Sequence, residues 1–227
     1  MGFAGGSLFD SEGHIPPVFC EDESASQSVD EKARAFSVVK RTFDVGMSIL
    51  LLPLLVGVGV IIWLLNPFLN KGSLLFSQVR MGRGCKAFMA YKFRSMSDAE
   101  IITRGAEDPL EIERITRLGF WLRRSRIDEL PQLINVLKGD MSLIGPRPDY
   151  FHHARKYLKH VPGYRERHAV RPGISGLAQT EVGYVEGAEA TAAKVRADIY
   201  YINNSSLKLD AWIFWRTVMT VLGHKGT

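Results

Sequence analysis

The uncharged apolar run from residue 45 to residue 65 is the feature that most constrains how this chain can fold. It contains no Asp, Glu, Lys or Arg, and its length matches the hydrocarbon thickness of a bilayer. Lys40 and Arg41 precede it and Trp63 lies near its end, a pattern typical of a membrane segment with a cytoplasmic basic flank. The run therefore predicts membrane contact, with a buried helix of a soluble protein as the alternative.

Pro53 falls in the middle of this run. A proline removes one helix hydrogen bond and can kink the helix, so the segment can return to the side from which it entered. We expect a re-entrant membrane helix over residues 36–69, with a membrane-spanning helix as the alternative.

The charge of the chain is unevenly distributed. Residues 1–31 hold seven carboxylates and no Lys or Arg, so of 29 basic and 24 acidic residues, 29 basic and 17 acidic remain downstream. Residues 1–35 are expected to be a mobile acidic tail. The basic remainder favours anionic partners, namely phospholipid headgroups, phosphate esters or nucleic acid. Cys20 and Cys85 lie far apart in the sequence, one of them in the tail-like segment, so no disulfide framework is indicated, which fits a reducing cytoplasm.

Downstream of the apolar run, the pattern predicts a small β-hairpin followed by helices. Two short apolar runs, 74–79 and 88–93, flank a glycine turn. Lys92 and Arg94 would share one side of the second strand, where they could contact phosphate or simply be edge-strand charges. The expected fold is α+β and mostly helical.

Two later helices have amphipathic character. Residues 149–160 place aromatic side chains on one helical face and basic side chains elsewhere, as in a helix lying in the headgroup region. The last helix, 209–222, contains Trp212 and Trp215, which suit either a core or a membrane interface.

The strongest chemical signal lies at residues 123–132. Asp128 and Glu129 follow a group of arginines that includes Arg123, and they precede an apolar run with helical spacing. A carboxylate can attack a phosphoanhydride while its neighbour holds a divalent cation and arginines neutralise the transferred charge. The alternative is that Asp128 simply caps the following helix.

Two further arginines are candidates for phosphate binding. Arg147 lies between Pro146 and Pro148, which restrict the backbone and can aim its guanidinium, although a simple proline turn is the alternative. Arg171 belongs to a segment of cations and turn glycines suited to cradling an anion, or to a solvated basic loop.

Six motifs in order extend this interpretation. They are Lys40-Arg41-Thr42-Phe43-Asp44, Tyr91-Lys92-Phe93-Arg94-Ser95-Met96, Asp128-Glu129-Leu130-Pro131-Gln132-Leu133, Gly139-Asp140-Met141-Ser142, Gly145-Pro146-Arg147-Pro148 and Arg171-Pro172-Gly173-Ile174-Ser175-Gly176. Together they resemble the bacterial sugar transferases, the small monotopic polyprenyl-phosphate phosphoglycosyl transferases. The resemblance covers residues 38–222.

This resemblance implies an enzyme that moves a sugar 1-phosphate from a UDP-sugar to undecaprenyl phosphate and releases UMP, priming surface-glycan or exopolysaccharide synthesis. It implies that Asp128 is the nucleophile and forms a covalent phosphosugar intermediate. Glu129 would help to bind Mg²⁺, together with Asp128, or to remove a proton. Arg123 and Arg147 occupy arginine positions of the family.

The resemblance also implies a location. Pro53 would form the break of a re-entrant helix-break-helix, so that residues 70–227 form a catalytic domain with interfacial helices at the cytoplasmic face of the bacterial inner membrane. Its partners would be a UDP-sugar, polyprenyl phosphate and the inner leaflet, without nucleic acid, and a homo-oligomer is left open. The chain has Leu52 before Pro53, where the family often has serine, and residues 180–184 differ from the family's usual Val-Asn-Gly-Arg stretch, so the sugar is not assigned.

A rival from another class is a non-catalytic membrane-anchored basic module that binds anionic lipid or nucleic acid. It explains the charge and the apolar run, but it gives no reason for an Asp-Glu pair among arginines.

Overall fold

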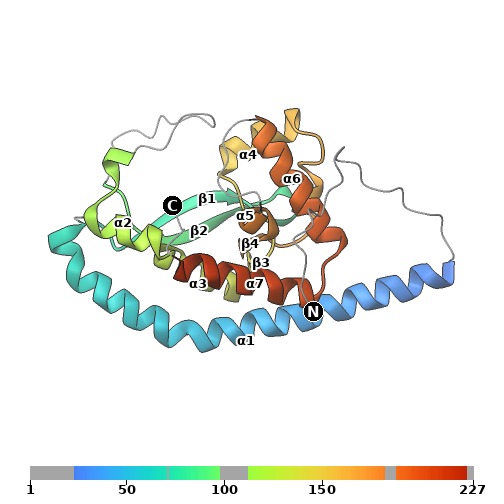
Figure 1. Ribbon diagram of the computed structural model, residues 1–227, viewed down its shortest axis with the longest axis horizontal. Coiled ribbons are helices and arrows are strands. Elements are labelled where there is room, and N and C mark those ends of the chain that lie inside the picture. The colour runs from blue at the N-terminus through green and yellow to red at the C-terminus, as the bar shows by residue number, and fades with distance from the viewer. Residues whose placement is uncertain (1–22, 71, 98–111, 182–187, 224–227) are drawn as a thin grey trace. The chain divides into compact units, whose positions relative to one another are not determined.

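The computed structural model describes residues 23–70, 72–97, 112–181 and 188–223 (Figure 1). The chain forms two units, residues 1–37 and 38–227. In the first unit, residues 23–37 are helical; residues 1–22, most of the predicted acidic tail, lie outside the described residues. The larger unit contains the hairpin, a second small sheet and most of the helices, so the predicted α+β, mostly helical class is confirmed.

Helix α1, Glu23–Leu69, runs without interruption through Pro53. The predicted non-helical break at this proline is therefore absent from the structure. Pro53 removes only its own N–H from the helix ladder, and the hydrogen bonds on either side let the helix continue. The helix also begins before residue 36, because residues 23–35 contain Ala, Glu, Lys and Gln and no Gly or Pro.

Within the larger unit, α1 has two different faces. The buried positions recur every four or seven residues, which places them on one side of a helix: Asp44, Ser48, Leu55, Ile62 and Asn66. Many of the apolar residues between them are exposed, among them Leu50, Val56 and Trp63. In the part of the chain that the structure describes, residues Ala35–Leu69 are the one stretch long and apolar enough to cross a membrane.

The predicted hairpin is present. Strand β1, Leu75–Met81, pairs antiparallel with β2, Ala87–Phe93, so that Leu75 lies opposite Phe93 and Met81 opposite Ala87. The turn between them contains the short 3₁₀ helix η1, Arg83–Cys85. At the far end of the hairpin, Phe93 packs with Leu55 and Ile62 of α1 and with Leu122 and Leu133 in one core cluster.

The remaining elements follow in chain order. They are η2 (Ile112–Arg114), α2 (Arg117–Arg124), η3 (Ile127–Glu129), α3 (Gln132–Lys138), β3 (Ser142–Ile144), α4 (Phe151–His160), η4 (Glu166–His168), β4 (Gly173–Ser175), α5 (Leu177–Glu181), α6 (Ala188–Asn203) and α7 (Leu207–Leu222).

The second sheet is a short parallel pair, β3 with β4, which sequence reasoning did not predict. Gly173 permits the close approach of the two segments, since a Cβ there would lie 2.1 Å from the Gly145 nitrogen. Three-residue strands are too short for periodicity to identify them.

Charged residues at the start of the apolar part of α1 attach it to the rest of the larger unit. Arg41 donates to the carbonyl of Val136 at 2.7 Å, at the C-terminal end of α3. Asp44 accepts from the Ser142 hydroxyl at 2.7 Å and from the Leu143 amide at 3.2 Å. These side chains position α1 against both α3 and β3.

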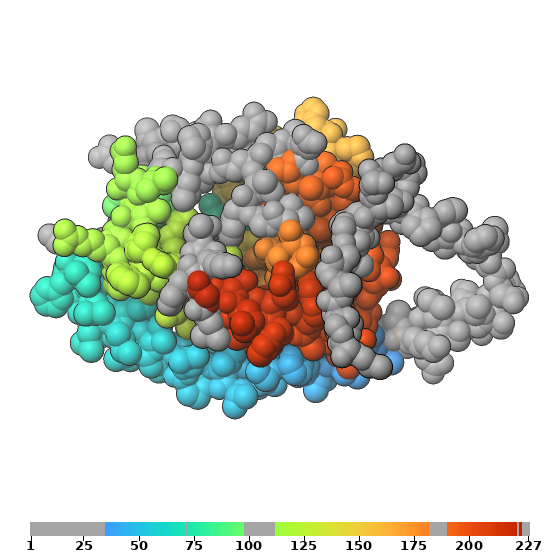
Figure 2. Space-filling view, viewed as in Figure 1, coloured from blue at the N-terminus to red at the C-terminus, as the bar shows by residue number. Residues whose placement is uncertain are grey.

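The two predicted interfacial helices behave differently. The apolar face of α4 packs in a core cluster around Met81 and Tyr164, so the prediction that it lies in the headgroup region is wrong. Helix α7 lies alongside α1 and is joined to it by a Lys40–Asp210 ion pair of 2.6 Å (Figures 1 and 2). Its Trp215 is 60% exposed, as a membrane-facing residue would be.

Candidate active site

The segment that leads into the Asp-Glu pair is fixed by helix α2. The Thr116 hydroxyl caps this helix by accepting from the Gly119 amide at 2.9 Å. Gly119 packs directly on the chain at Ser95, whose carbonyl oxygen would lie 1.9 Å from a Cβ at position 119. A glycine here therefore lets α2 pack against the end of the hairpin.

Asp128 and Glu129 lie in η3, between α2 and α3, and are only 7% and 6% exposed. The alternative that Asp128 caps a helix is wrong. Neither η3 nor α3 has a side-chain cap, and α3 begins after Pro131. The amide of Glu129 is instead satisfied by the carbonyl of Arg126, which adopts a left-handed conformation with φ of 55°. The two carboxylates are therefore buried without a capping role.

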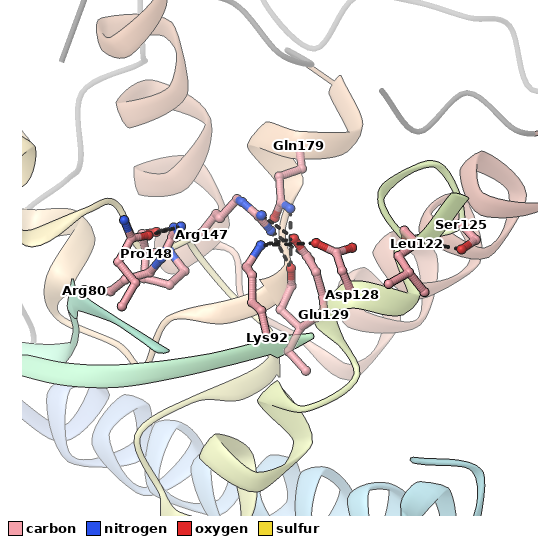
Figure 3. A network of polar contacts seen from close by, with 11 residues as sticks. Arg80, Lys92, Leu122, Ser125, Asp128, Glu129, Arg147, Pro148 and Gln179 are labelled. Carbon is pink, nitrogen blue, oxygen red and sulfur yellow. Dashed lines mark hydrogen bonds and ion pairs between the residues drawn. The ribbon is translucent and has the colours of Figure 1, made fainter. Parts of the chain in front are cut away.

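Glu129 accepts from two cations (Figure 3). Lys92 Nζ lies 2.8 Å from Oε1, and Arg147 donates through Nη1 to Oε2 at 3.0 Å and through Nη2 to Oε1. Two-point binding by arginine is among the strongest carboxylate contacts in proteins. Burial favours the neutral carboxyl, but the charges and hydrogen bonds of Arg147 and Lys92 outweigh this and hold the pKa of Glu129 well below its usual range.

Asp128 is much less engaged than its neighbour. Its contact with Lys92 is a longer ion pair, with Nζ 3.9 Å from Oδ2. Burial raises the pKa of Asp128 and the Glu129 carboxylate raises it further, against the lowering effects of Lys92, Arg147 and Arg123. The pair thus divides into one firmly ionised, clamped carboxylate and one more basic carboxylate beside it, a division typical of acid–base and nucleophilic sites.

Lys92 is held in place by side-chain hydrogen bonds that link β2 to α3. The buried Asn135 side chain accepts from the Tyr91 amide at 3.0 Å and donates to the Met89 carbonyl at 2.6 Å. These bonds fix the strand that carries Lys92 against the helix that follows Glu129. Burial lowers the pKa of Lys92, and Arg147 lowers it as well, while Glu129 and Asp128 oppose this.

The small parallel sheet brings Arg147 to the site. The Gly145 amide donates to the Ser175 carbonyl at 2.8 Å, and the Gly173 amide donates to the Pro146 carbonyl at 2.9 Å. Arg147 follows at once, with its guanidinium directed at Glu129 (Figure 3). The structure therefore places Arg147 at the carboxylate pair, and its role in binding phosphate stays a prediction.

The other predicted phosphate-binding residues fall into two groups. Lys92 contacts both carboxylates, and Arg123 lies near enough for its charge to lower the pKa of Asp128.

Arg94 donates to the Ser73 hydroxyl at 2.5 Å in an exposed contact at the start of the hairpin. Arg171 donates to the Gly139 carbonyl at 3.0 Å, at the end of α3 opposite to the carboxylates. Neither of these contacts involves the carboxylate pair.

Sequence reasoning missed Gln179 in α5. Its Nε2 donates to the Ile174 carbonyl at 3.4 Å, and Arg147 Nη1 donates to the same carbonyl at 3.4 Å. Gln179 Oε1 is buried without a hydrogen-bond partner among the described residues. Figure 3 places this amide beside the cluster, where it can bind a donor group of a ligand. Only its position three residues after Gly176, the end of the Arg171–Gly176 motif, could have indicated it from the sequence.

The carboxylates allow a limited test of Mg²⁺ binding. In proteins, Mg²⁺ is usually held by one or two carboxylates together with substrate phosphates and water. Asp128 fits this role because its carboxylate is only loosely paired, whereas Glu129 fits only if Lys92 or Arg147 moves onto the substrate. No group of three or more His, Cys, Asp and Glu that could hold a metal occurs within the described ranges. A bound ion would therefore need phosphate or water oxygens as further ligands.

A buried carboxylate pair with Lys92 and Arg147 in contact with it, and with the charge of Arg123 acting on Asp128, is an arrangement suited to binding phosphate groups. The sequence profile of the bacterial sugar transferases matches residues 35–224. The chain belongs to the bacterial sugar transferase family.

Three relatives from different bacteria illustrate this membership. The chain is 42% identical to the UDP-N-acetylgalactosamine-undecaprenyl-phosphate N-acetylgalactosaminephosphotransferase of Aeromonas hydrophila, over 82% of the chain and 44% of that protein. It is 41% identical to the exopolysaccharide production protein PSS of Rhizobium leguminosarum, over 82% of the chain and 96% of that protein. It is 40% identical to the UDP-glucose:undecaprenyl-phosphate glucose-1-phosphate transferase of Caulobacter vibrioides, over 86% of the chain and 71% of that protein. The chain thus spans less than half of the Aeromonas protein and nearly all of the Rhizobium one.

Proposed function

We propose that this protein transfers a sugar 1-phosphate from a UDP-sugar to a polyprenyl phosphate, forming polyprenyl diphosphate sugar and UMP. The observation that carries this proposal is the loosely paired, more basic Asp128 beside a clamped Glu129. The names of the Aeromonas and Caulobacter relatives support undecaprenyl phosphate as the acceptor class. Because those names contain different sugars, the sugar is left open.

The reaction has two displacement steps. In the first, an Asp128 carboxylate oxygen attacks the sugar-linked phosphorus of the UDP-sugar. An Asp128 O–P bond forms, the bond between this phosphorus and the bridging oxygen breaks, and UMP leaves with that oxygen. In the second, a phosphate oxygen of the polyprenyl phosphate attacks the same phosphorus and releases the Asp128 carboxylate.

The cations around Asp128 give these steps their electrostatic support. Lys92 and Arg147 both form ion pairs with Glu129, the residue next to Asp128. Arg123 lies close enough for its charge to lower the pKa of Asp128. Pre-positioned cations in a buried site stabilise the charge of a transferring phosphoryl group more strongly than they would in water. Glu129 has the role of holding Lys92 and Arg147 in this arrangement.

Asp128 and, after rearrangement of the cations, Glu129 would hold Mg²⁺. When bound, the ion would neutralise charge on the diphosphate of the donor.

We also propose that the protein is monotopic at the cytoplasmic face of the bacterial inner membrane, with both ends of α1 on the cytoplasmic side. One face of α1 is covered by the larger unit from Asp44 to Asn66, while apolar side chains occupy the other. A helix that crossed the bilayer would carry the polar groups packed on it to membrane depth, which is costly. The exposed tryptophan of α7 fits the same interface.

The chemistry is tested by incubating purified protein with labelled UDP-sugars and Mg²⁺ in the absence of lipid. We expect one UDP-sugar to release UMP and to leave a sugar phosphate on the peptide that contains Asp128, detected by mass spectrometry. Asp128→Asn should lower turnover at least about 1,000-fold, since the nucleophile is lost. Glu113→Gln, an amide replacement at an exposed acidic residue, is the matched control. If Asp128→Asn retains turnover, the nucleophile assignment is wrong.

The non-catalytic alternative predicts a different result in the same assay. A basic binding module would bind anionic vesicles or nucleic acid in a salt-sensitive manner and release no UMP from any UDP-sugar. The topology is tested by cysteine labelling from each side of the membrane. Labelling of the residues before α1 from the periplasm would refute the monotopic arrangement.

A further inference from the structure

The main chain around Arg147 is held in an unusual way. Pro146 and Pro148 have no N–H groups, so this segment offers mainly carbonyls for attachment. Three successive carbonyls are bound from three different elements. The Gly173 amide of β4 binds the Pro146 carbonyl at 2.9 Å, and Arg80 of β1 binds the Pro148 carbonyl at 2.5 Å. The carbonyl of Arg147 itself accepts from Arg167 Nη2 at 2.8 Å.

Arg167 is a buried guanidinium, only 4% exposed, in η4. It contacts the Asp149 carboxylate through Nη1, and its Nη2 lies 2.7 Å from Asp198 Oδ2 of α6. Tyr164 donates to the same Asp149 oxygen at 2.6 Å. Arg167 thus joins α6, η4 and the segment that carries Arg147.

Stability alone is a weak reason for such a cluster. Burying Arg167 and Asp198 costs desolvation free energy, and apolar side chains of similar volume often stabilise a fold as well or better. A planar guanidinium has another advantage, because it can hold a carbonyl and two carboxylates in fixed directions at once. Here the Arg167 guanidinium fixes the main chain of Arg147, whose side chain binds Glu129.

We propose that Arg167 is a positioning residue of the transfer site: by binding the Arg147 carbonyl, it keeps the Arg147 guanidinium on Glu129 and directed at the phosphate groups. This rests on the proposed function. Arg167 is separated from Glu129 by Arg147 and acts through it. Asp149 and Asp198 hold Arg167 in place.

The test compares Arg167→Lys with the wild-type protein. Lysine keeps a positive charge for Asp149 and Asp198 but cannot reproduce the forked contact to the Arg147 carbonyl. We expect kcat for UMP release to fall about 10- to 100-fold, since a misplaced charged group costs rates of this order. Ile213→Val, a fully buried substitution in α7, is the stability control and should leave kcat unchanged. Normal kcat in a folded Arg167→Lys protein would overturn the proposal.

A double-mutant cycle separates positioning from a general structural role. If Arg167 acts through Arg147, Arg167→Lys should change the residual kcat by less than about twofold in an Arg147→Ala background. A loss as large as in the wild-type background would mean that Arg167 acts independently of Arg147, and the proposal would be wrong.

Hydrogen–deuterium exchange gives a readout that does not require turnover. Amides in residues 145–151 should exchange faster in Arg167→Lys than in the wild type or in Ile213→Val, because the Arg147 carbonyl has lost its donor. Unchanged exchange would overturn the proposal. If the wild type releases no UMP from any UDP-sugar, the proposed function fails, while faster exchange in Arg167→Lys still supports the positioning of Arg147.

Discussion

Arg147 binds both carboxylate oxygens of Glu129, and this two-point ion pair makes Glu129 differ from the adjacent Asp128. Glu129 is held ionised by Arg147 and Lys92, so its pKa is low, while burial keeps the pKa of Asp128 above its usual value. The more basic carboxylate is the one with a loosely paired oxygen. This is the physical reason for assigning attack on phosphorus to Asp128 and the organising role to Glu129.

The organising role of Glu129 can be tested with Glu129→Gln. Glutamine keeps the shape but loses the charge that holds Lys92 and Arg147, so we expect kcat to fall about 100-fold. Removing one partner of a buried ion pair should also lower the free energy of unfolding by about 3 kcal/mol. Initial rates of UMP release and thermal unfolding measure the two effects, with Glu113→Gln as the control. A wild-type rate and a wild-type unfolding free energy in Glu129→Gln would contradict the organising role of Glu129.

Arg147→Lys tests the geometry of the contact. A lysine retains the charge but binds through one nitrogen, so kcat/KM for the UDP-sugar should fall about 10- to 100-fold. Arg94→Lys is the matched control, because Arg94 makes an exposed contact with Ser73 and should lose less than about twofold. If Arg147→Lys lost no more kcat/KM than Arg94→Lys, the positive charge at position 147 would be sufficient and the two-point contact would not matter.

Arg171→Ala tests whether Arg171 binds phosphate, as predicted, or supports only the end of α3. Arg171 binds the Gly139 carbonyl at the end of α3, where a cation also interacts favourably with the helix dipole. We expect the free energy of unfolding to fall by about 1 kcal/mol, with kcat/KM changed by less than about twofold. Denaturant unfolding and initial rates check this. A large loss of kcat/KM at unchanged stability would restore Arg171 to the phosphate site.

Asp198 should impose a pH dependence on stability. Burial, with a contribution from the Asp149 carboxylate, raises the pKa of Asp198 to about 6 against the lowering effect of Arg167. The folded state therefore holds this proton more tightly than the unfolded state does. The resulting stabilisation is fully present below the ordinary pKa of 3.8 and is lost as the pH rises through about 6.

Asp198→Asn should remove this dependence, because the amide does not titrate. Relative to the wild type, the variant should gain about 2 kcal/mol in the free energy of unfolding between pH 4 and pH 7. Urea unfolding across this pH range measures the difference. Parallel pH profiles for the two proteins would contradict the raised pKa of Asp198.

Local patterns were sufficient for part of this picture. The length of the apolar run, the two strands around a glycine turn and the helical spacing from Leu130 to Leu137 each depend on neighbours in the chain. The long apolar helix, the hairpin and the helix after Glu129 are present, although α1 lacks the predicted break at Pro53. The apolar face of α4 was assigned to the membrane because its pattern is the same whether its partner is lipid or protein. Only the packing of α4 against Met81 and Tyr164 distinguishes the two.

The candidate site shows the same limit on what local sequence patterns can predict. The sequence by itself determined that Asp128 and Glu129 are adjacent, that arginines precede them and that prolines restrict Arg147. Only the tertiary structure decided that Lys92 and Arg147 meet at Glu129, that Arg171 lies at the other end of α3, and that Arg167 reaches the Arg147 carbonyl. These contacts join residues far apart in the chain, and burial then sets their pKa values. Neither quantity is encoded in local spacing, because both depend on which segments exclude water together.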